Sequence, residues 1–255
     1  MTDLFNLGDL IDPEADLDKA ALIDLKDPEM PRTYSFRDVD DAANAVARGL
    51  IKRGFQRGDR VAILSENRME FISAYFGTMK AGMVSVPVNF KFPGATIEFI
   101  LQDADIKFVF ADAQQTAKVP TEYDIVNFDD ADNYAAFCDP GPFDAVRAES
   151  DEVAMFLYTS GSTGRPKGVP LTHAGHLWVV EQRIAKRPDP DHRLIVAAPL
   201  YHMNGLAIFK VAMAAHLSVV LLPKFSAPAY INAVETYKVT WLTSVAAMMA
   251  MVVRE

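Results

Sequence analysis

Residues 158–169 read YTSGSTGRPKGV, a run dense in the small and polar residues that suit phosphate binding. Glycine leaves backbone N–H groups open to close approach by a ligand, and side-chain hydroxyls add further donors. Lys167 supplies a positive charge that can pair with phosphate oxygens. This combination suits a ligand of high negative charge density. The alternative for the same composition is a flexible, solvated loop with an exposed lysine.

The run differs from the commonest nucleotide-binding motif, G-x-x-x-x-G-K-[ST], which needs glycine directly before the lysine. Here Pro166 precedes Lys167, and Gly168 follows it. The residue order therefore excludes a GTPase or an ordinary P-loop ATPase.

The order of the whole run resembles the phosphate-binding signature of the adenylate-forming (AMP-binding) superfamily, which includes acyl- and aryl-CoA ligases, luciferases and peptide-synthetase adenylation domains. PLYHMNG at 199–205 resembles the family's segment beside the acyl pocket. GDRVAIL and KAGMVSVPVN resemble phrases of its N-terminal region, so the resemblance covers nearly the whole chain. It implies that a carboxylate and ATP give an acyl-adenylate and pyrophosphate, after which a thiol takes the acyl group.

The resemblance also implies roles for individual residues. Lys167 and His202 would be catalytic, with His202 at the junction of the acyl carboxylate and the nucleotide. A core histidine satisfied by hydrogen bonds is the alternative for His202, given its apolar neighbours. The expected pyrophosphate cradle is Thr159, Ser160, Gly161, Ser162, Thr163, Gly164 and Lys167. The expected acyl-binding residues are Tyr201, His202, Met203, Asn204, Gly205 and Val245.

The segment after the loop bears on the substrate class. PLYHMNGLAIF has no acidic residue, whereas amino-acid-activating members carry one there to hold the substrate's ammonium group. This favours a CoA ligase for a fatty or another apolar acid over a peptide-synthetase domain. Ala246 stands where the family usually has proline, so the family's pocket shape does not carry over directly to Val245.

By the same resemblance, the chain would use ATP, Mg²⁺ and coenzyme A together with a small carboxylic acid. We assign no metal ligand, because the family's magnesium-binding glutamate lies in a Tyr-Gly-x-Thr-Glu segment that this sequence lacks. The ribose-binding aspartate and the small C-terminal domain with its catalytic lysine are also missing. We therefore expect the N-terminal part of a larger ligase, with little or no activity alone.

Two alternatives come from other classes of protein. One is a non-catalytic nucleotide- or polyphosphate-binding module. The other is an interaction fragment, with a homo-oligomer formed through its apolar end, SVAAMMAMVVRE. Coding sequence that continued beyond Glu255 into the missing motifs would favour the ligase over both.

Strands alternating with helices predict an α/β fold with parallel sheets covered by helices. Apolar runs predict strands at 60–64, 83–88, 106–111, 153–158, 193–198, 217–222 and 239–243. Helical spacing predicts helices over 35–53, 69–82, 95–105 and 173–186. Ser35 and Asp38 have the spacing of a capping box, Gly54 is a C-terminal cap, and His173 is expected to be structural.

We expect two successive α/β subdomains. Residues 1–150 would form the first, ending in an acidic connecting segment. Residues 151–255 would hold the phosphate-binding loop and a second, incomplete subdomain. The connection, 121–152, has ten acids and one base, which indicates a solvated segment without a catalytic role.

Charge and composition exclude other classes. A formal net charge of −9 argues against a nucleic-acid partner, because phosphate backbones bind basic surfaces. The acidic N-terminus does not resemble a signal peptide. The apolar stretch 205–223 carries Lys210 and His216 in its interior, which suits a buried helix and strand better than a membrane span. With one cysteine, Cys138, we expect a soluble cytoplasmic protein without integral membrane contact.

Overall fold

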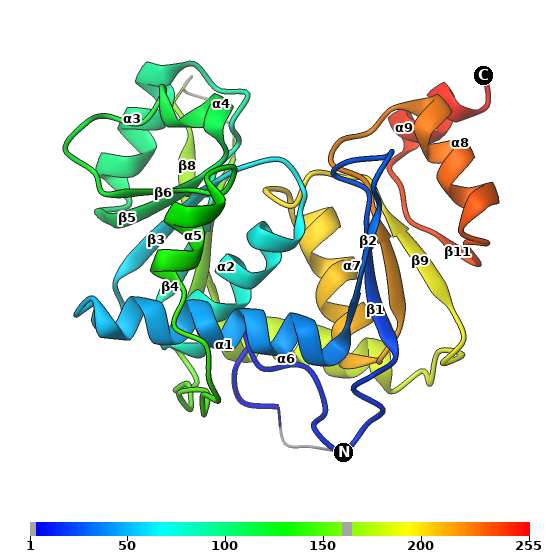
Figure 1. Cartoon of the computed structure of the whole chain (residues 1–255), viewed down its shortest axis with the longest axis horizontal. Helices are drawn as coiled ribbons and strands as arrows, with labels where there is room; N and C mark the ends of the chain where they lie inside the picture. Colours follow the sequence, from blue (N-terminus) through cyan, green and yellow to red (C-terminus); the bar gives the residue numbers. More distant parts are fainter. Residues whose placement is uncertain (1–3, 160–164) are drawn as a thin grey trace.

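The computed structural model describes residues 4–159 and 165–255, which form two β-sheets with helices between and around them (Figure 1). The larger sheet has the strand order β6-β5-β3-β4-β7-β8, and the smaller has the order β11-β9-β10-β1-β2. Neighbouring strands pair in parallel except β7 with β8 and β1 with β2. The predicted α/β class with two parallel-containing sheets is confirmed.

The strands include all those predicted from apolar runs. They are β1 (Ala20–Asp24), β2 (Arg32–Ser35), β3 (Arg60–Leu64), β4 (Val84–Pro87), β5 (Ile106–Ala111), β6 (Ile125–Asn127), β7 (Val153–Thr159), β8 (Lys167–Thr172), β9 (Arg193–Val196), β10 (Ser218–Leu221) and β11 (Trp241–Leu242). The helices are α1 (Phe36–Lys52), α2 (Met69–Lys80), α3 (Gly94–Asp103), α4 (Ala113–Thr116), α5 (Ala131–Phe137), α6 (His173–Ile184), α7 (Met203–Ala214), α8 (Ala227–Thr236) and α9 (Ala246–Val252). Helices α2 and α7 lie between the two sheets, and α1 and α6 run across one end of them (Figure 1).

The two sheets do not follow the order of the chain. The N-terminal strands β1 and β2 join β9, β10 and β11, whereas β7 and β8 join the strands of the first half. In the parallel pairing of β1 with β10, Leu22 lies opposite Val219. A boundary after residue 150 therefore does not separate the sheets, and the division into 1–150 and 151–255 stays a prediction about domains.

The acidic stretch 121–152 is more ordered than its composition predicts. It contains β6 and α5, and Phe128 and Phe137 are buried in the core. The ring of Phe137 packs against Phe108 and Phe110 at centroid distances of 5.2 and 5.0 Å. The prediction of a solvated connection is wrong for these aromatic side chains, because they anchor the stretch to the larger sheet even though it carries ten acidic residues.

Local signals set the ends of α1 as predicted. The Ser35 hydroxyl accepts a hydrogen bond from the Asp38 N–H, and the Asp38 carboxylate accepts one from the Ser35 N–H. Gly54 follows the helix with a φ of +87°, a left-handed conformation that glycine adopts without strain. The apolar stretch 205–223 is likewise the predicted helix and strand, α7 and β10. Across residues 4–159 and 165–255, no helix combines the length and the apolar character needed to cross a membrane.

His173 fastens the N-terminal segment to α6, in keeping with its expected structural role. It is the first residue of α6 and is only 2% exposed. Its Nδ1 accepts a hydrogen bond of 3.0 Å from the N–H of Leu7. Burial is the main cause that lowers the pKa of His173 from 6.5 to about 4, so the folded protein holds a neutral imidazole.

We expect the free energy of unfolding to rise with pH between about 4 and 6.5, with His173 contributing roughly 3 kcal/mol across this window. In this range the unfolded chain binds a proton at His173 that the folded chain does not, so a lower pH favours unfolding. Urea unfolding of the wild type and of His173→Gln across the range measures the effect. The variant should lose this part of the slope, and equal slopes would contradict the prediction.

Candidate functional site

The candidate phosphate-binding loop joins β7 to β8, which form an antiparallel hairpin at the edge of the larger sheet. Thr159 lies opposite Lys167, and both residues are exposed. The remaining cradle residues, Ser160, Gly161, Ser162, Thr163 and Gly164, lie outside the described residues. The two ends of the proposed cradle are therefore placed on facing strands, and the cradle itself stays a prediction.

Strand β8 is an element that the sequence analysis does not predict. It contains Pro170, which lacks a backbone N–H and therefore disfavours a strand inside a sheet. The strand forms nevertheless because β8 lies at the edge of its sheet, where one side of the backbone has no neighbouring strand to bond. The alternating apolar residues Val169 and Leu171 are the signal that could have revealed it.

Helix α3 supports the hairpin on both sides of the loop. The Tyr158 hydroxyl donates a hydrogen bond of 2.7 Å to the Asp103 carboxylate. Burial and this hydrogen bond raise the pKa of Tyr158, so the phenol keeps its proton. Beyond the loop, the Arg165 guanidinium lies 5.5 Å from the centre of the Phe99 ring. Since Asp103 and Phe99 both belong to α3, this helix fixes the strands that carry the loop.

Replacing Gly168 by alanine is expected to displace the Tyr158 ring, because a Cβ at this position would lie 2.9 Å from Cζ and 3.2 Å from Cε2 of the ring. Overpacking of this kind costs about 1–3 kcal/mol of folding stability. Gly94→Ala is a matched control, since a Cβ there would meet nothing within 4 Å. Chemical denaturation should show a loss for Gly168→Ala alone. Equal stability of the two variants would count against this contact.

His202 is the residue directly before α7 and acts as its N-cap without a side-chain capping bond. The residue reaches the surface, and the Tyr201 ring lies 4.6 Å from its imidazole. Partial burial of the imidazole lowers the pKa of His202, and the positive charge of Lys91 lowers it further. Both effects favour a neutral imidazole. The alternative of a buried core histidine is therefore wrong, and the catalytic role stays a prediction.

The neighbours of His202 differ in how they face the solvent. Tyr201 is buried and meets the Phe90 ring edge-on, with centroids 5.2 Å apart. Met203 is half-buried and Asn204 is exposed, both on the first turn of α7. Gly205 is buried, and a Cβ there would lie 2.9 Å from a main-chain oxygen, so close packing requires glycine at this position.

Val245 is 43% exposed and is the residue before α9. It follows β11, which pairs in parallel with β9, and the segment 199–205 follows β9. Because the carboxyl ends of neighbouring parallel strands lie at the same edge of a sheet, both segments leave the smaller sheet at that edge. This placement is compatible with the predicted acyl-binding role of Val245.

The carboxyl edge of the larger sheet meets the segment that carries His202. Asn67 follows β3, and its Oδ1 accepts a hydrogen bond of 2.8 Å from the N–H of Leu200. Phe90 follows β4 and contacts Tyr201. In the sheet β4 lies between β3 and β7, and the carboxyl end of β7 leads into the phosphate-binding loop. The loop and His202 therefore leave the two sheets at edges that face each other, which could bring a polyphosphate and a carboxylate together.

Sequence reasoning missed Asn67, Phe90 and Lys91 at this edge. All three follow strands at their carboxyl ends, where open parallel sheets bind their ligands. The polar run SEN after RVAIL is the signal that could have revealed Asn67. Phe90 and Lys91 carry no motif of their own.

Metal-binding side chains do not gather in the part of the chain that the structure describes. Within residues 4–159 and 165–255, no group of three or more His, Cys, Asp or Glu side chains could hold a metal ion. The use of Mg²⁺ stays a prediction. A nucleotide fits better, because the exposed Lys167 offers a cation beside the loop.

Comparison with known proteins gives a family match over most of the chain. A model described as AMP-binding enzyme matches residues 12–255. Tyrocidine synthase 2 of Brevibacillus parabrevis is 37% identical over 144 residues, which cover 56% of this chain and 4% of that protein. The 4-coumarate–CoA ligase 1 of Petroselinum crispum is 29% identical over 240 residues, which cover 88% of this chain and 44% of that ligase.

Among solved structures, ATP-bound MatB from Rhodopseudomonas palustris has a TM-score of 0.85 and 27% sequence identity. The match covers 98% of this chain and 50% of the MatB chain. This chain thus spans about half the length of MatB and less than half of the coumarate ligase.

Proposed function

Because this chain belongs to the AMP-binding enzyme family, we propose that it is the N-terminal part of an ATP-dependent carboxylate–CoA ligase. The similarity to 4-coumarate–CoA ligase 1 over 88% of the chain supports this class of reaction. The observation that carries the proposal is where the β7–β8 hairpin lies relative to the segment around His202. Lys167 is exposed at the start of β8, and its loop leaves an edge that faces the segment around His202.

The proposed reaction has two steps. A carboxylate oxygen attacks the α-phosphorus of ATP, and the bond from that phosphorus to the oxygen bridging to pyrophosphate breaks. The sulfur of CoA, having lost its proton, then attacks the acyl carbon, and AMP leaves with the electron pair of the broken C–O bond. Charge builds up on the departing pyrophosphate, so fixed donors beside it lower the barrier.

In the first step, Lys167 and the hydroxyl and N–H groups of residues 159–164 would hold the pyrophosphate portion of ATP. The imidazole of His202, held neutral by its surroundings, would donate a hydrogen bond to the acid's carboxylate. Mg²⁺ bound together with ATP would neutralise further phosphate charge.

We propose a fatty or another apolar acid as the substrate. Tyr201, Phe90 and Met203 give the edge around His202 an apolar character, and the segment 199–209 contains no acidic residue. The second candidate is an amino acid, which the 37% identity to tyrocidine synthase 2 favours. A free ammonium group would lack a carboxylate partner in that segment.

Acid-dependent exchange of labelled pyrophosphate into ATP tests the proposal. The intact protein that carries this chain would be assayed with fatty, aromatic and amino acids, and acyl-CoA would be measured by mass spectrometry. We expect exchange and acyl-CoA with an apolar acid, and little or no turnover by residues 1–255 alone. Exchange with amino acids only would favour the second candidate. ATP binding without exchange for any acid would favour a non-catalytic nucleotide-binding protein.

A further inference from the structure

Asn67 lies in the short loop between β3 and α2, where the two sheets come together. It is a polar residue with only 1% of its surface exposed. A buried amide is costly unless its donors and acceptor are paired, so the partners of Asn67 show what holds it there.

The partners of Asn67 lie in the segments that directly follow β9 and β10 of the smaller sheet. Its Nδ2 donates hydrogen bonds to the carbonyl oxygens of Ala198, at 3.1 Å, and Leu222, at 3.0 Å. Its Oδ1 accepts from the N–H of Leu200 at 2.8 Å, and its own N–H donates to the Pro223 oxygen at 3.1 Å. One side chain therefore ties the segments after β9 and β10 to the loop after β3.

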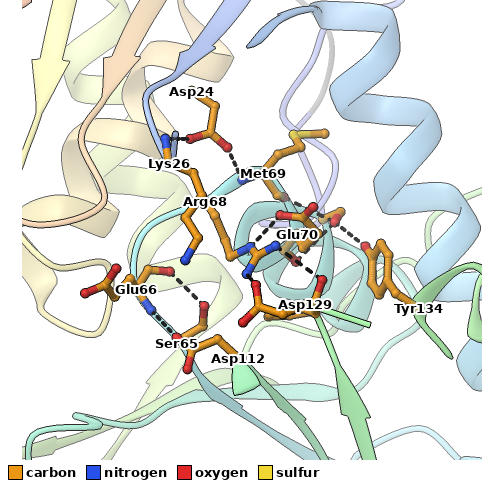
Figure 2. A network of polar contacts seen from close by, with 12 residues as sticks. Asp24, Lys26, Ser65, Glu66, Arg68, Met69, Glu70, Asp112, Asp129 and Tyr134 are labelled. Atoms are coloured by element: carbon orange, nitrogen blue, oxygen red, sulfur yellow. Dashed lines mark hydrogen bonds and ion pairs between the residues drawn. The ribbon is translucent and has the colours of Figure 1, made fainter. Parts of the chain in front are cut away.

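The residues on either side of Asn67 are fixed as well (Figure 2). The N–H of Glu66 donates to Asp112, which follows β5 of the larger sheet, at 3.1 Å. The N–H of Met69 donates to Asp24, the last residue of β1 in the smaller sheet, at 2.8 Å. The loop is thus held from both sheets, and Asn67 cannot shift without disturbing one of them.

These contacts act on the segment that carries His202. Ala198 and Leu200 come immediately before Tyr201 and His202, so their main-chain bonds to Asn67 set where this segment leaves the smaller sheet. The other end of the connection is the larger sheet, which carries the β7–β8 hairpin and Lys167. We propose that Asn67 is a positioning residue that holds the acyl-binding segment 199–205 in place relative to the β7–β8 hairpin that carries Lys167.

This inference rests on the proposed ligase function, and it predicts a specific kinetic defect. Without the amide, segment 199–205 would no longer be held in a fixed position relative to the β7–β8 hairpin. Misplacement of reacting groups by about an ångström can cost up to 100-fold in rate. Because the other contacts of the loop would still hold the segment in part, we expect a loss of about 10-fold in rate. The loss should fall on kcat/KM for the acid, whereas the KM for ATP should change less than about 2-fold.

Asn6 provides a matched control, because it is also a fully buried asparagine whose side-chain bonds, within the described residues, go to main-chain atoms. Its Nδ2 donates to the oxygens of Met79 and Val146, each at 2.8 Å, and its Oδ1 accepts from the Gly8 N–H at 2.7 Å. Asn6→Ala therefore removes the same number and kind of bonds as Asn67→Ala, but away from the segment that carries His202.

The experiment measures pyrophosphate exchange by the intact protein with the acid that the wild type accepts, for Asn67→Ala and Asn6→Ala, at saturating ATP and then at saturating acid. A loss of about 10-fold in kcat/KM for the acid in Asn67→Ala, beyond any loss in Asn6→Ala, is the expected result. Equal losses of kcat/KM for the acid in the two variants, or a rise in the KM for ATP as large as the loss in kcat/KM for the acid, would overturn the proposal.

If either alanine variant fails to fold, Asn67→Ser and Asn6→Ser replace them. Serine keeps one acceptor and one donor, so Asn67→Ser should retain part of the activity. Its loss should again fall on kcat/KM for the acid, and the comparison with Asn6→Ser is judged by the same outcomes as for the alanine variants. Failure of the wild type to exchange pyrophosphate with any acid would instead reject the ligase function itself. The two failures are therefore distinguishable.

Discussion

Lys167→Ala is expected to slow adenylate formation about 100-fold in the intact protein, the loss typical for removal of one preorganised group that stabilises developing charge. The lysine is the first residue of β8 and lies opposite Thr159, the residue at which the proposed cradle begins. When the bond to pyrophosphate breaks, negative charge moves onto the departing group, and this cation is the nearest one along the chain after Arg165. Pyrophosphate exchange at saturating acid measures the rate.

The fold should survive this change, because Lys167 is exposed on an edge strand. Thermal unfolding of Lys167→Ala should therefore match the wild type. Lys186→Ala, which removes an exposed lysine just past the end of α6, is the control for a change in net charge. Lys167→Arg keeps the charge and should recover part of the rate. An exchange rate for Lys167→Ala equal to that of Lys186→Ala would remove this lysine from the mechanism.

The sequence could predict the parts of this fold that depend on local signals. The capping box at Ser35 and the helical spacing after it located α1. Apolar runs such as 60–64 and 106–111 became β3 and β5, because a strand covered on both faces needs apolar residues at nearly every position. The run 158–169 identified the family because its residue order is also a local signal, which needs no contact with distant parts of the chain.

The features that sequence reasoning missed depend on contacts between distant parts of the chain. β1 is a short apolar strand whose partner, β10, lies almost two hundred residues later. The acids of 121–152 concealed the buried Phe128 and Phe137, because charge indicates exposure only for the residues that carry it. The candidate site depends in the same way on Asn67, whose polar atoms are paired across the two sheets.

The charged network beside Asn67 is a second consequence of bringing these distant segments together. Arg68 is 7% exposed, and its guanidinium contacts Glu70 at 2.7 Å and Asp129 at 2.5 Å. It also donates to the Phe128 carbonyl at 3.2 Å, so all its nitrogens are bonded (Figure 2). Burial opposes the charge, yet the two carboxylates outweigh it and raise the pKa of Arg68.

Arg68→Ala is therefore expected to lower the free energy of unfolding by about 3 kcal/mol at neutral pH, because it leaves Glu70 and Asp129 as partly buried carboxylates without their cation. Arg37→Ala is the matched control, since its ion pair with Asp18 is exposed at 53% and 80% of the two side chains and should contribute little. Urea unfolding measures both variants. Equal destabilisation of the two would contradict the buried-network interpretation.

The pH dependence of this loss gives a stricter test of its cause. Burial acts to raise the pKa of Asp129, but a hydrogen bond from the Ala113 N–H and then the contacts with Arg68 bring it below the usual 3.8. A carboxyl group with a lowered pKa contributes stability above its ordinary pKa, and the protein loses that contribution as the pH falls through the folded value. The gap between the wild type and Arg68→Ala should therefore be largest near neutral pH and shrink below about pH 4. A gap that stays constant from pH 7 to pH 3 would assign the loss to packing of the arginine side chain instead of its charge.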